Sequence, residues 1–174
     1  IHMVCYNFMP VFDWTRSDLA KMRSDGSTVL AYDQKIIDQI NPDEMLSSMG
    51  EKSNGFVLPG WEPERMARIK ELFELYKEVD EAKLFENLEY FLERIMPTCE
   101  KYQIKMAIHP DDPAWPVFGV PRIVTDKEKL HQVLSLVDSP YNGITLCSGS
   151  LGSNPANDIP DIITRFHNLE AEKE

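Results

Sequence analysis

Apolar residues dominate the first eleven positions and recur in two shorter runs much further along the chain. Residues 1–11 (IHMVCYNFMPV) are β-branched, aromatic or apolar on both faces, which predicts a strand buried from both sides. The runs at 104–109 and 143–147 each precede a polar segment and predict two further strands. A polar loop is expected over 12–19, and Asp25-Gly26 predicts a hairpin or excursion within 23–33.

Helical periodicity governs the stretches between these strands. Residues 34–50 predict a short helix and then a second one that starts at Pro42 and ends at Gly50. Apolar residues at helical spacing predict longer helices over 62–79 and 80–103, and Pro97 should kink the latter or free one of its carbonyls. The apolar positions of these two helices are expected to form core: Met66, Ile69, Leu72, Phe73, Tyr76, Val79, Leu84, Phe85, Leu88, Phe91, Leu92, Ile95 and Met96.

Two more helices are predicted in the last third of the chain. A capping box from Thr125 to Glu128 opens a helix over 125–139. After 143–147, a loop capped by Ser153 or Asn154 leads into a helix that starts at Pro155. Strands separated by helices imply parallel pairing through crossovers, so the fold class is α/β. Three strands are too few for a closed (β/α)₈ barrel, which leaves a small open sheet or a piece of a larger barrel.

Composition narrows the functional classes. The 174 residues suffice for one domain, and the net charge of −11 disfavours binding to nucleic acid or anionic lipid. The apolar runs are too short to span a bilayer. Three cysteines with no CxxC spacing argue against a disulfide framework and predict a cytoplasmic protein.

The first group of candidate functional residues is the segment HPDDP at 109–113, which directly follows a predicted strand. His109 with Asp111 and Asp112 offers imidazole and carboxylate ligands for a divalent metal, or a general acid–base pair. The alternative is that the two carboxylates cap a loop and His109 is an ordinary polar residue at a strand end.

Cys147 ends the next predicted strand, 38 residues after His109, and neighbouring βα units would bring the two together. They could share a metal, whereas a small buried hydrophobe and a nucleophile are the other interpretations of this thiol. SGSLGSN follows, with the hydroxyls of Ser148 and Ser150, and could bind an anion or be an ordinary βα loop.

Three further polar residues flank these segments. Arg122, in the apolar segment GVPRIV, could hold a substrate carboxylate or pair with Asp111 or Asp112. Asn7 and Arg16, on either side of the end of the first predicted strand, are similar candidates. His131 and His167 lie in predicted helices and are expected to be structural or solvent-facing.

Taken together, three long blocks of sequence resemble the mannonate dehydratase family of bacterial hexuronate catabolism. They are VCYNFMPVFDWTR, MAIHPDDPAWPVFGVPRIV and SPYNGITLCSGSLGSNPANDIPDII, in that order. The resemblance implies a xylose-isomerase-like (β/α)₈ barrel that dehydrates D-mannonate to 2-dehydro-3-deoxy-D-gluconate with Mn²⁺ or Fe²⁺. By motif, His109 and Cys147 correspond to metal ligands of the family. The expected substrate contacts are Arg122, then Asn7, Arg16, Asp111, Asp112, Ser148 and Ser150.

The resemblance also implies that residues 1–174 form the middle of one barrel domain, without its first and last strands. The remaining metal ligands and the catalytic residues are expected beyond Glu174, so the 174-residue piece alone should be inactive. The intact enzyme is expected to be a cytoplasmic homo-oligomer, a dimer, acting on a small sugar acid. The alternatives are a metal-dependent sugar isomerase or epimerase of the same barrel type and a non-catalytic fragment that binds sugar acids.

Overall fold

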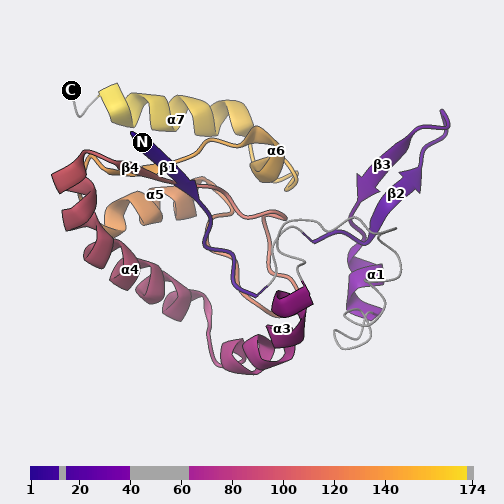
Figure 1. Ribbon diagram of the computed structural model, residues 1–174. Helices are drawn as coiled ribbons and strands as arrows, with labels where there is room; N and C mark the ends of the chain where they lie inside the picture. Colours follow the sequence, from indigo (N-terminus) through magenta and orange to yellow (C-terminus); the bar gives the residue numbers. More distant parts are fainter. Residues whose placement is uncertain (12–14, 40–62, 172–174) are drawn as a thin grey trace.

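A three-stranded parallel sheet forms the centre of the molecule. The computed structural model describes residues 1–11, 15–39 and 63–171. The strands β1 (Met3–Tyr6), β4 (Lys105–Ile108) and β5 (Asn142–Ile144) lie in the order β1-β4-β5, with β4 in the middle (Figure 1). Tyr6 pairs with Ile108, which pairs with Ile144, so the strands end at the same edge. The predicted α/β class with parallel strands is confirmed, and the eight-stranded barrel stays a prediction.

Strand β1 is shorter and more exposed than the sequence predicted. It has four residues rather than eleven, and Met3 is 58% exposed. The expectation that it is buried on both sides is therefore wrong for the described residues. β1 is an edge strand of the three-stranded sheet. Because side chains alternate along a strand, only Val4 and Tyr6 lie on the face of the sheet where Ile108 packs against the helices.

A separate antiparallel hairpin stands away from the parallel sheet (Figure 1). It consists of β2 (Asp18–Met22) and β3 (Thr28–Ala31), followed by α1 (Gln34–Gln39). The turn is the predicted Asp25-Gly26 one: Asp25 Oδ1 accepts from the N–H of Ser27 at 2.9 Å, and Gly26 has φ 84°. The loop predicted over 12–19 ends earlier, because β2 already begins at Asp18. The helix predicted from Pro42 to Gly50 lies outside the described residues.

The two long helices match their predictions closely. They are α3 (Pro63–Tyr76) and α4 (Glu81–Tyr102). The Asp80 carboxylate caps α4 by accepting from the N–H of Lys83 at 2.8 Å, and Gln103 ends the helix in the left-handed region at φ 54°. Pro97 lies inside α4 without ending it.

The remaining helices begin at other residues than predicted. Helix α5 (Lys127–Leu136) is capped by Asp126, whose Oδ1 accepts from the N–H of Lys129 at 3.0 Å, so the predicted Thr125–Glu128 capping box is wrong. The loop after β5 contains a short helix, α6 (Ser148–Leu151). The last helix, α7 (Ile159–Ala171), begins four residues after Pro155, and Asp158 accepts from the N–H of Asp161 at 3.0 Å. At the starts of α5 and α7 an Asp carboxylate thus provides the acceptor that the free N–H groups require.

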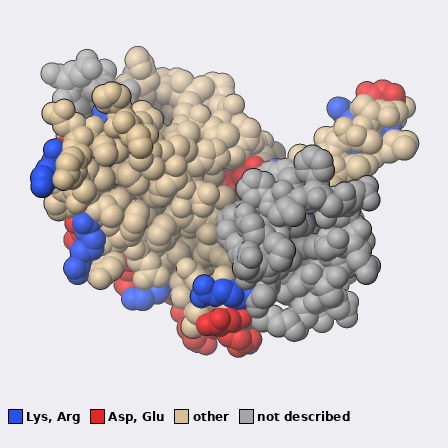
Figure 2. All heavy atoms as spheres, in the orientation of Figure 1, with Lys and Arg blue, Asp and Glu red and all other residues tan. Residues whose placement is uncertain are grey.

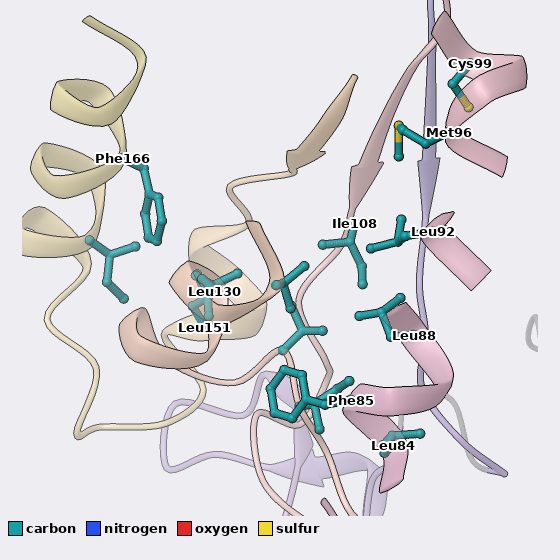
Figure 3. Close-up of a cluster of buried hydrophobic side chains, with 14 residues drawn as sticks. Leu84, Phe85, Leu88, Leu92, Met96, Cys99, Ile108, Leu130, Leu151 and Phe166 are labelled. Atoms are coloured by element: carbon teal, nitrogen blue, oxygen red, sulfur yellow. The ribbon is translucent and has the colours of Figure 1, made fainter. Parts of the chain in front are cut away.

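The hydrophobic core joins the sheet to α4, α5, α6 and α7 (Figure 3). Ile108 of β4 is fully buried beside Leu88 and Leu92 of α4, as the helical spacing predicted. Complete burial of one such side chain contributes about 1.5–3 kcal/mol. The buried members of the cluster are Leu84, Phe85, Leu88, Leu92, Met96, Cys99, Ile108, Ile123, Val124, Leu130, Val133, Leu151, Ile162 and Phe166.

The surface carries its charges unevenly. In Figure 2 the visible face over the sheet is largely free of charged side chains, and Lys, Arg, Asp and Glu gather toward its margins. None of the helices in the described part of the chain combines the length and hydropathy needed to cross a bilayer. Cys5, Cys99 and Cys147 are all free thiols, as the cysteine spacing predicted.

Candidate functional site

His109 and Cys147 meet beyond the carboxyl ends of β4 and β5. His109 directly follows β4, and its backbone N–H donates to the carbonyl of Tyr6 at 2.6 Å. Cys147 lies three residues beyond β5, at the N-cap position of α6, rather than inside a strand as predicted. His109 lies close enough to the Cys147 thiol to lower its pKa. The predicted proximity of the two side chains is therefore confirmed.

The His109 ring is held in one orientation. Its Nδ1 lies 2.8 Å from the carbonyl oxygen of Pro110, and because a carbonyl only accepts, Nδ1 must carry the proton. This leaves Nε2 as the ring nitrogen available to a sulfur or a metal. A backbone carbonyl behind Nδ1 is the usual arrangement that orients an imidazole ligand.

The surroundings of Cys147 favour its thiolate. Burial raises the pKa of this thiol, but the hydroxyl and backbone N–H of Ser150 and the hydrogen bond and charge of His109 outweigh burial and hold the pKa below its ordinary value. Ser150 Oγ lies 3.4 Å from Cys147 Sγ. A thiolate, not a thiol, is the form that binds metals and attacks electrophiles. The interpretation of Cys147 as a small hydrophobe is therefore disfavoured.

A carboxylate and a guanidinium lie next to this pair. Asp112 Oδ2 accepts from Ser150 Oγ at 3.5 Å, and Asp112 Oδ1 forms an ion pair with Arg16 at 2.9 Å. Both charged side chains are mostly buried, at 17% and 15% exposed. Thus Arg16, Asp112, Ser150, Cys147 and His109 form one connected group. All five were predicted site residues, but apart from the expected proximity of His109 and Cys147 the sequence did not indicate how they connect.

Asp111 and Arg122 lie in the interior instead. Asp111 is fully buried, and its Oδ2 accepts from the backbone N–H groups of Ile123 and Val124 at 3.0 and 2.9 Å. Burial raises the pKa of Asp111, and the Arg122 charge partly opposes that rise. Arg122 is only 1% exposed. Its burial and its effect on Asp111 agree with the predicted structural role, while a substrate contact stays a prediction.

The other predicted residues are accessible. Asn7 follows β1 at the same edge of the sheet and is exposed, as is Ser148 at the start of α6. His131 and His167 are exposed on α5 and α7, which agrees with the solvent-facing role expected for them. The substrate contacts predicted for Asn7 and Ser148 remain predictions.

Ser153 is a site-supporting residue that the sequence analysis considered only as a helix cap. Its Oγ donates to the carbonyl of Ser150 at 2.6 Å and accepts from the N–H of Ala114 at 3.3 Å. It therefore ties α6 to the loop that follows Asp112. A serine in a Gly- and Ser-rich loop carries no sequence signal for a contact 39 residues away.

The donor set fits a first-row divalent metal. An oriented imidazole and a cysteine sulfur are both ligands that first-row transition metals such as iron and zinc accept. Over 1–11, 15–39 and 63–171, no group of three or more His, Cys, Asp or Glu side chains converges on one point. His109 and Cys147 would thus supply two ligands, fewer than the three that catalytic centres usually take from protein.

Comparisons with known proteins all point to one protein family. The D-mannonate dehydratase (UxuA) family model matches residues 1–171. The chain is 72% identical to a mannonate dehydratase of Brachyspira hyodysenteriae, over 94% of the chain and 46% of that protein. It is 61% identical to one of Geobacillus thermodenitrificans, over 95% of the chain and 45% of that protein.

A solved structure shows the same similarity in three dimensions. The crystal structure of mannonate dehydratase from Streptococcus suis serotype2 superposes with a TM-score of 0.75 at 42% identity, covering 93% of this chain and 40% of that one. The chain thus spans less than half the length of the relatives it matches. Since the family model covers nearly every residue, the chain belongs to the D-mannonate dehydratase family.

Proposed function

We propose that the intact protein is a mannonate dehydratase that converts D-mannonate to 2-dehydro-3-deoxy-D-gluconate and water in the cytoplasm, as part of hexuronate catabolism. The match of residues 1–171 to this family carries the proposal. The same resemblance supports a (β/α)₈ barrel, to which β1, β4 and β5 would contribute three adjacent parallel strands. A homodimer is the proposed assembly.

The proposed reaction removes a proton from C2 of the sugar acid and the hydroxyl from C3. The resulting enol gains a proton at C3 and becomes the 2-keto acid, so the products are the keto-deoxy acid and one water. The C2–H bond is only weakly acidic, and breaking it places negative charge on the substrate carboxylate. A site for this reaction must therefore hold the carboxylate and stabilise that charge.

The residues of this chain supply part of such a site. His109 and Cys147 would hold Mn²⁺ or Fe²⁺, which when bound acts as a Lewis acid toward substrate oxygens. Arg16 and Asn7, which lie at or near the same strand-end edge, would orient the hydroxyls or carboxylate of the sugar acid. Arg16 is already paired with Asp112, so it is held in a fixed position before substrate arrives.

The product distinguishes this function from the alternatives. D-Mannonate should be incubated with the intact protein and Mn²⁺ or Fe²⁺, and the products analysed by NMR. A 2-keto-3-deoxy acid is the expected result, whereas a ketose would indicate an isomerase. Binding of D-mannonate without turnover would indicate a non-catalytic protein.

The metal centre is tested with Cys147→Ala beside Cys99→Ala. Cys99 is buried in the core away from the site, so its replacement controls for loss of a thiol. Cys147→Ala should lose both metal and turnover, and Cys99→Ala should keep both at reduced stability. Retention of stoichiometric metal by Cys147→Ala would contradict the assignment of this thiol as a ligand.

A further inference from the structure

Ser150 occupies the position between the Cys147 thiol and the Asp112 carboxylate. Its hydroxyl is 3.4 Å from Cys147 Sγ and 3.5 Å from Asp112 Oδ2, and the residue is 4% exposed. It is therefore shielded from solvent and in contact with both groups. Neither the family match nor the sequence pattern assigns it a role at the thiol.

The partners of Asp112 keep that carboxylate in place. Its Oδ1 is bound by Arg16 at 2.9 Å, and its backbone N–H points to the sulfur of Met9 at 3.4 Å. With one oxygen held by Arg16, the other faces the Ser150 hydroxyl. The Ser150 hydroxyl, with a single proton, thus lies within hydrogen-bond distance of both the Asp112 carboxylate and the Cys147 sulfur.

The hydroxyl is separable from the part that Ser150 plays in the fold. Ser153 binds the backbone carbonyl of Ser150, and that contact does not need the side chain. Alanine also favours the helical conformation of α6 more than serine does. Replacing Ser150 by alanine therefore removes the hydroxyl contacts to Cys147 and Asp112 and leaves the backbone hydrogen bonds, including that of the Ser150 N–H, in place.

We propose that Ser150 is a positioning residue that connects the Arg16–Asp112 ion pair to the Cys147 sulfur and so fixes the direction and strength of that sulfur as a metal ligand. In metal sites, residues that hydrogen-bond to a ligand without touching the metal orient that ligand. Their loss weakens metal binding by about 10–100-fold. The inference rests on the proposed metal centre, and it extends that centre to a residue that does not touch the metal.

The test uses Co²⁺ as a spectroscopic probe in the intact protein, because a sulfur–Co²⁺ bond gives a charge-transfer band that reports on this ligand. Ser150→Ala should bind Co²⁺ and Mn²⁺ about 10–100-fold more weakly and shift the band. Ser150→Thr, which keeps the hydroxyl, should restore the affinity and the band toward wild type. Asp112→Asn, which keeps an acceptor but loses the charge, should give an intermediate affinity.

Ser139→Ala is the matched control. Ser139 is another buried serine, and its Oγ donates to Glu100 Oε1 at 2.8 Å, away from the strand-end edge. Its replacement should lower the melting temperature and leave Co²⁺ affinity and spectrum unchanged. A shift of the same size in Ser139→Ala would show that general destabilisation, not the Ser150 hydroxyl, sets metal binding, and would overturn the proposal.

The remaining outcomes separate this proposal from the proposed function. Wild-type affinity and an unshifted band in Ser150→Ala would overturn the positioning role and leave the dehydratase assignment intact. If the wild-type band is normal and shifts in Ser150→Ala, the positioning role is supported. If the wild-type protein then fails to turn over D-mannonate, the proposed function is contradicted while the positioning role stands. No sulfur–Co²⁺ band in wild type would overturn the positioning role together with the metal centre. Should Ser150→Ala fail to fold, a wild-type affinity for Asp112→Asn would still overturn it.

Discussion

The buried pair of Asp111 and Arg122 gives a prediction whose outcome decides what Arg122 does. Both side chains are almost completely inaccessible, and the Arg122 charge acts on the Asp111 carboxylate. Asp111 also accepts from two backbone N–H groups, of Ile123 and Val124. The perturbations are Arg122→Met, Asp111→Asn and the double variant, which together form a double-mutant cycle.

The two single variants should lower the free energy of unfolding by different amounts. Removing one partner of a buried ion pair costs about 3–5 kcal/mol, because the other charge is left uncompensated. In Arg122→Met the remaining carboxyl can take up a proton, since its pKa is already raised by burial, so the loss should be near the lower figure. In Asp111→Asn the guanidinium cannot lose its charge, so the loss should be near the upper one.

Urea unfolding followed by circular dichroism measures these losses. With a slope of about 2 kcal/mol per molar urea, a loss of about 3 kcal/mol moves the midpoint by about 1.5 M. The double variant should cost less than the sum of the singles by about 0.5–3 kcal/mol. Arg165→Met, at an exposed position of α7, is the control and should change stability by less than about 0.5 kcal/mol.

One result would refute the reasoning. If Arg122→Met is within about 0.5 kcal/mol of wild type and the cycle is additive, the two residues do not interact energetically. Arg122 would then be free of a structural role, and a large rise in KM for D-mannonate in that variant would establish the substrate contact instead. Lost stability is the result expected here, and the KM of the same variant then decides whether Arg122 also contacts the substrate.

Three further predictions concern the core, a helix cap and the thiols. Leu88→Ala should lower the free energy of unfolding by about 2–5 kcal/mol because Leu88 is fully buried, whereas Leu75→Ala, at a position 62% exposed on α3, should cost less than about 1 kcal/mol in the same urea titration. Asp126→Ala should cost about 1 kcal/mol through loss of the α5 cap, and a neutral result would reject that cap. In metal-free protein at pH 7, Cys147 should react with iodoacetamide faster than Cys99, whose thiol pKa is raised by burial; mass mapping of the labelled peptides checks the order, and equal rates would contradict it.

The hydrophobic pattern determined most of the helical and strand content. Periodicity over 62–79 and 80–103 predicted α3 and α4 within a few residues, because a helix that buries one face repeats apolar residues at a local spacing. The Asp25-Gly26 hairpin was predicted for the same reason, since a turn depends on its own residues. Element ends were less predictable: Asp126 and Asp158 cap α5 and α7, whereas the sequence favoured Thr125 for the first and Ser153 or Asn154 for the second.

The candidate site divides in the same way. Sequence alone identified His109, Cys147, Asp112, Arg16 and Ser150 as chemistry-bearing residues, and strand-end placement predicted that the first two meet. Which arginine lies near which carboxylate was decided only by the tertiary structure, which pairs Arg16 with Asp112 and buries Arg122 where its charge acts on Asp111. Parallel strand pairing brings these segments together. Asp111 is fully buried, whereas its neighbour Asp112 is partly exposed, so the two carboxylates meet different arginines. Local periodicity carries no information about contacts between segments so far apart, and for that reason the chain specified the parts of the site and the fold specified how they connect.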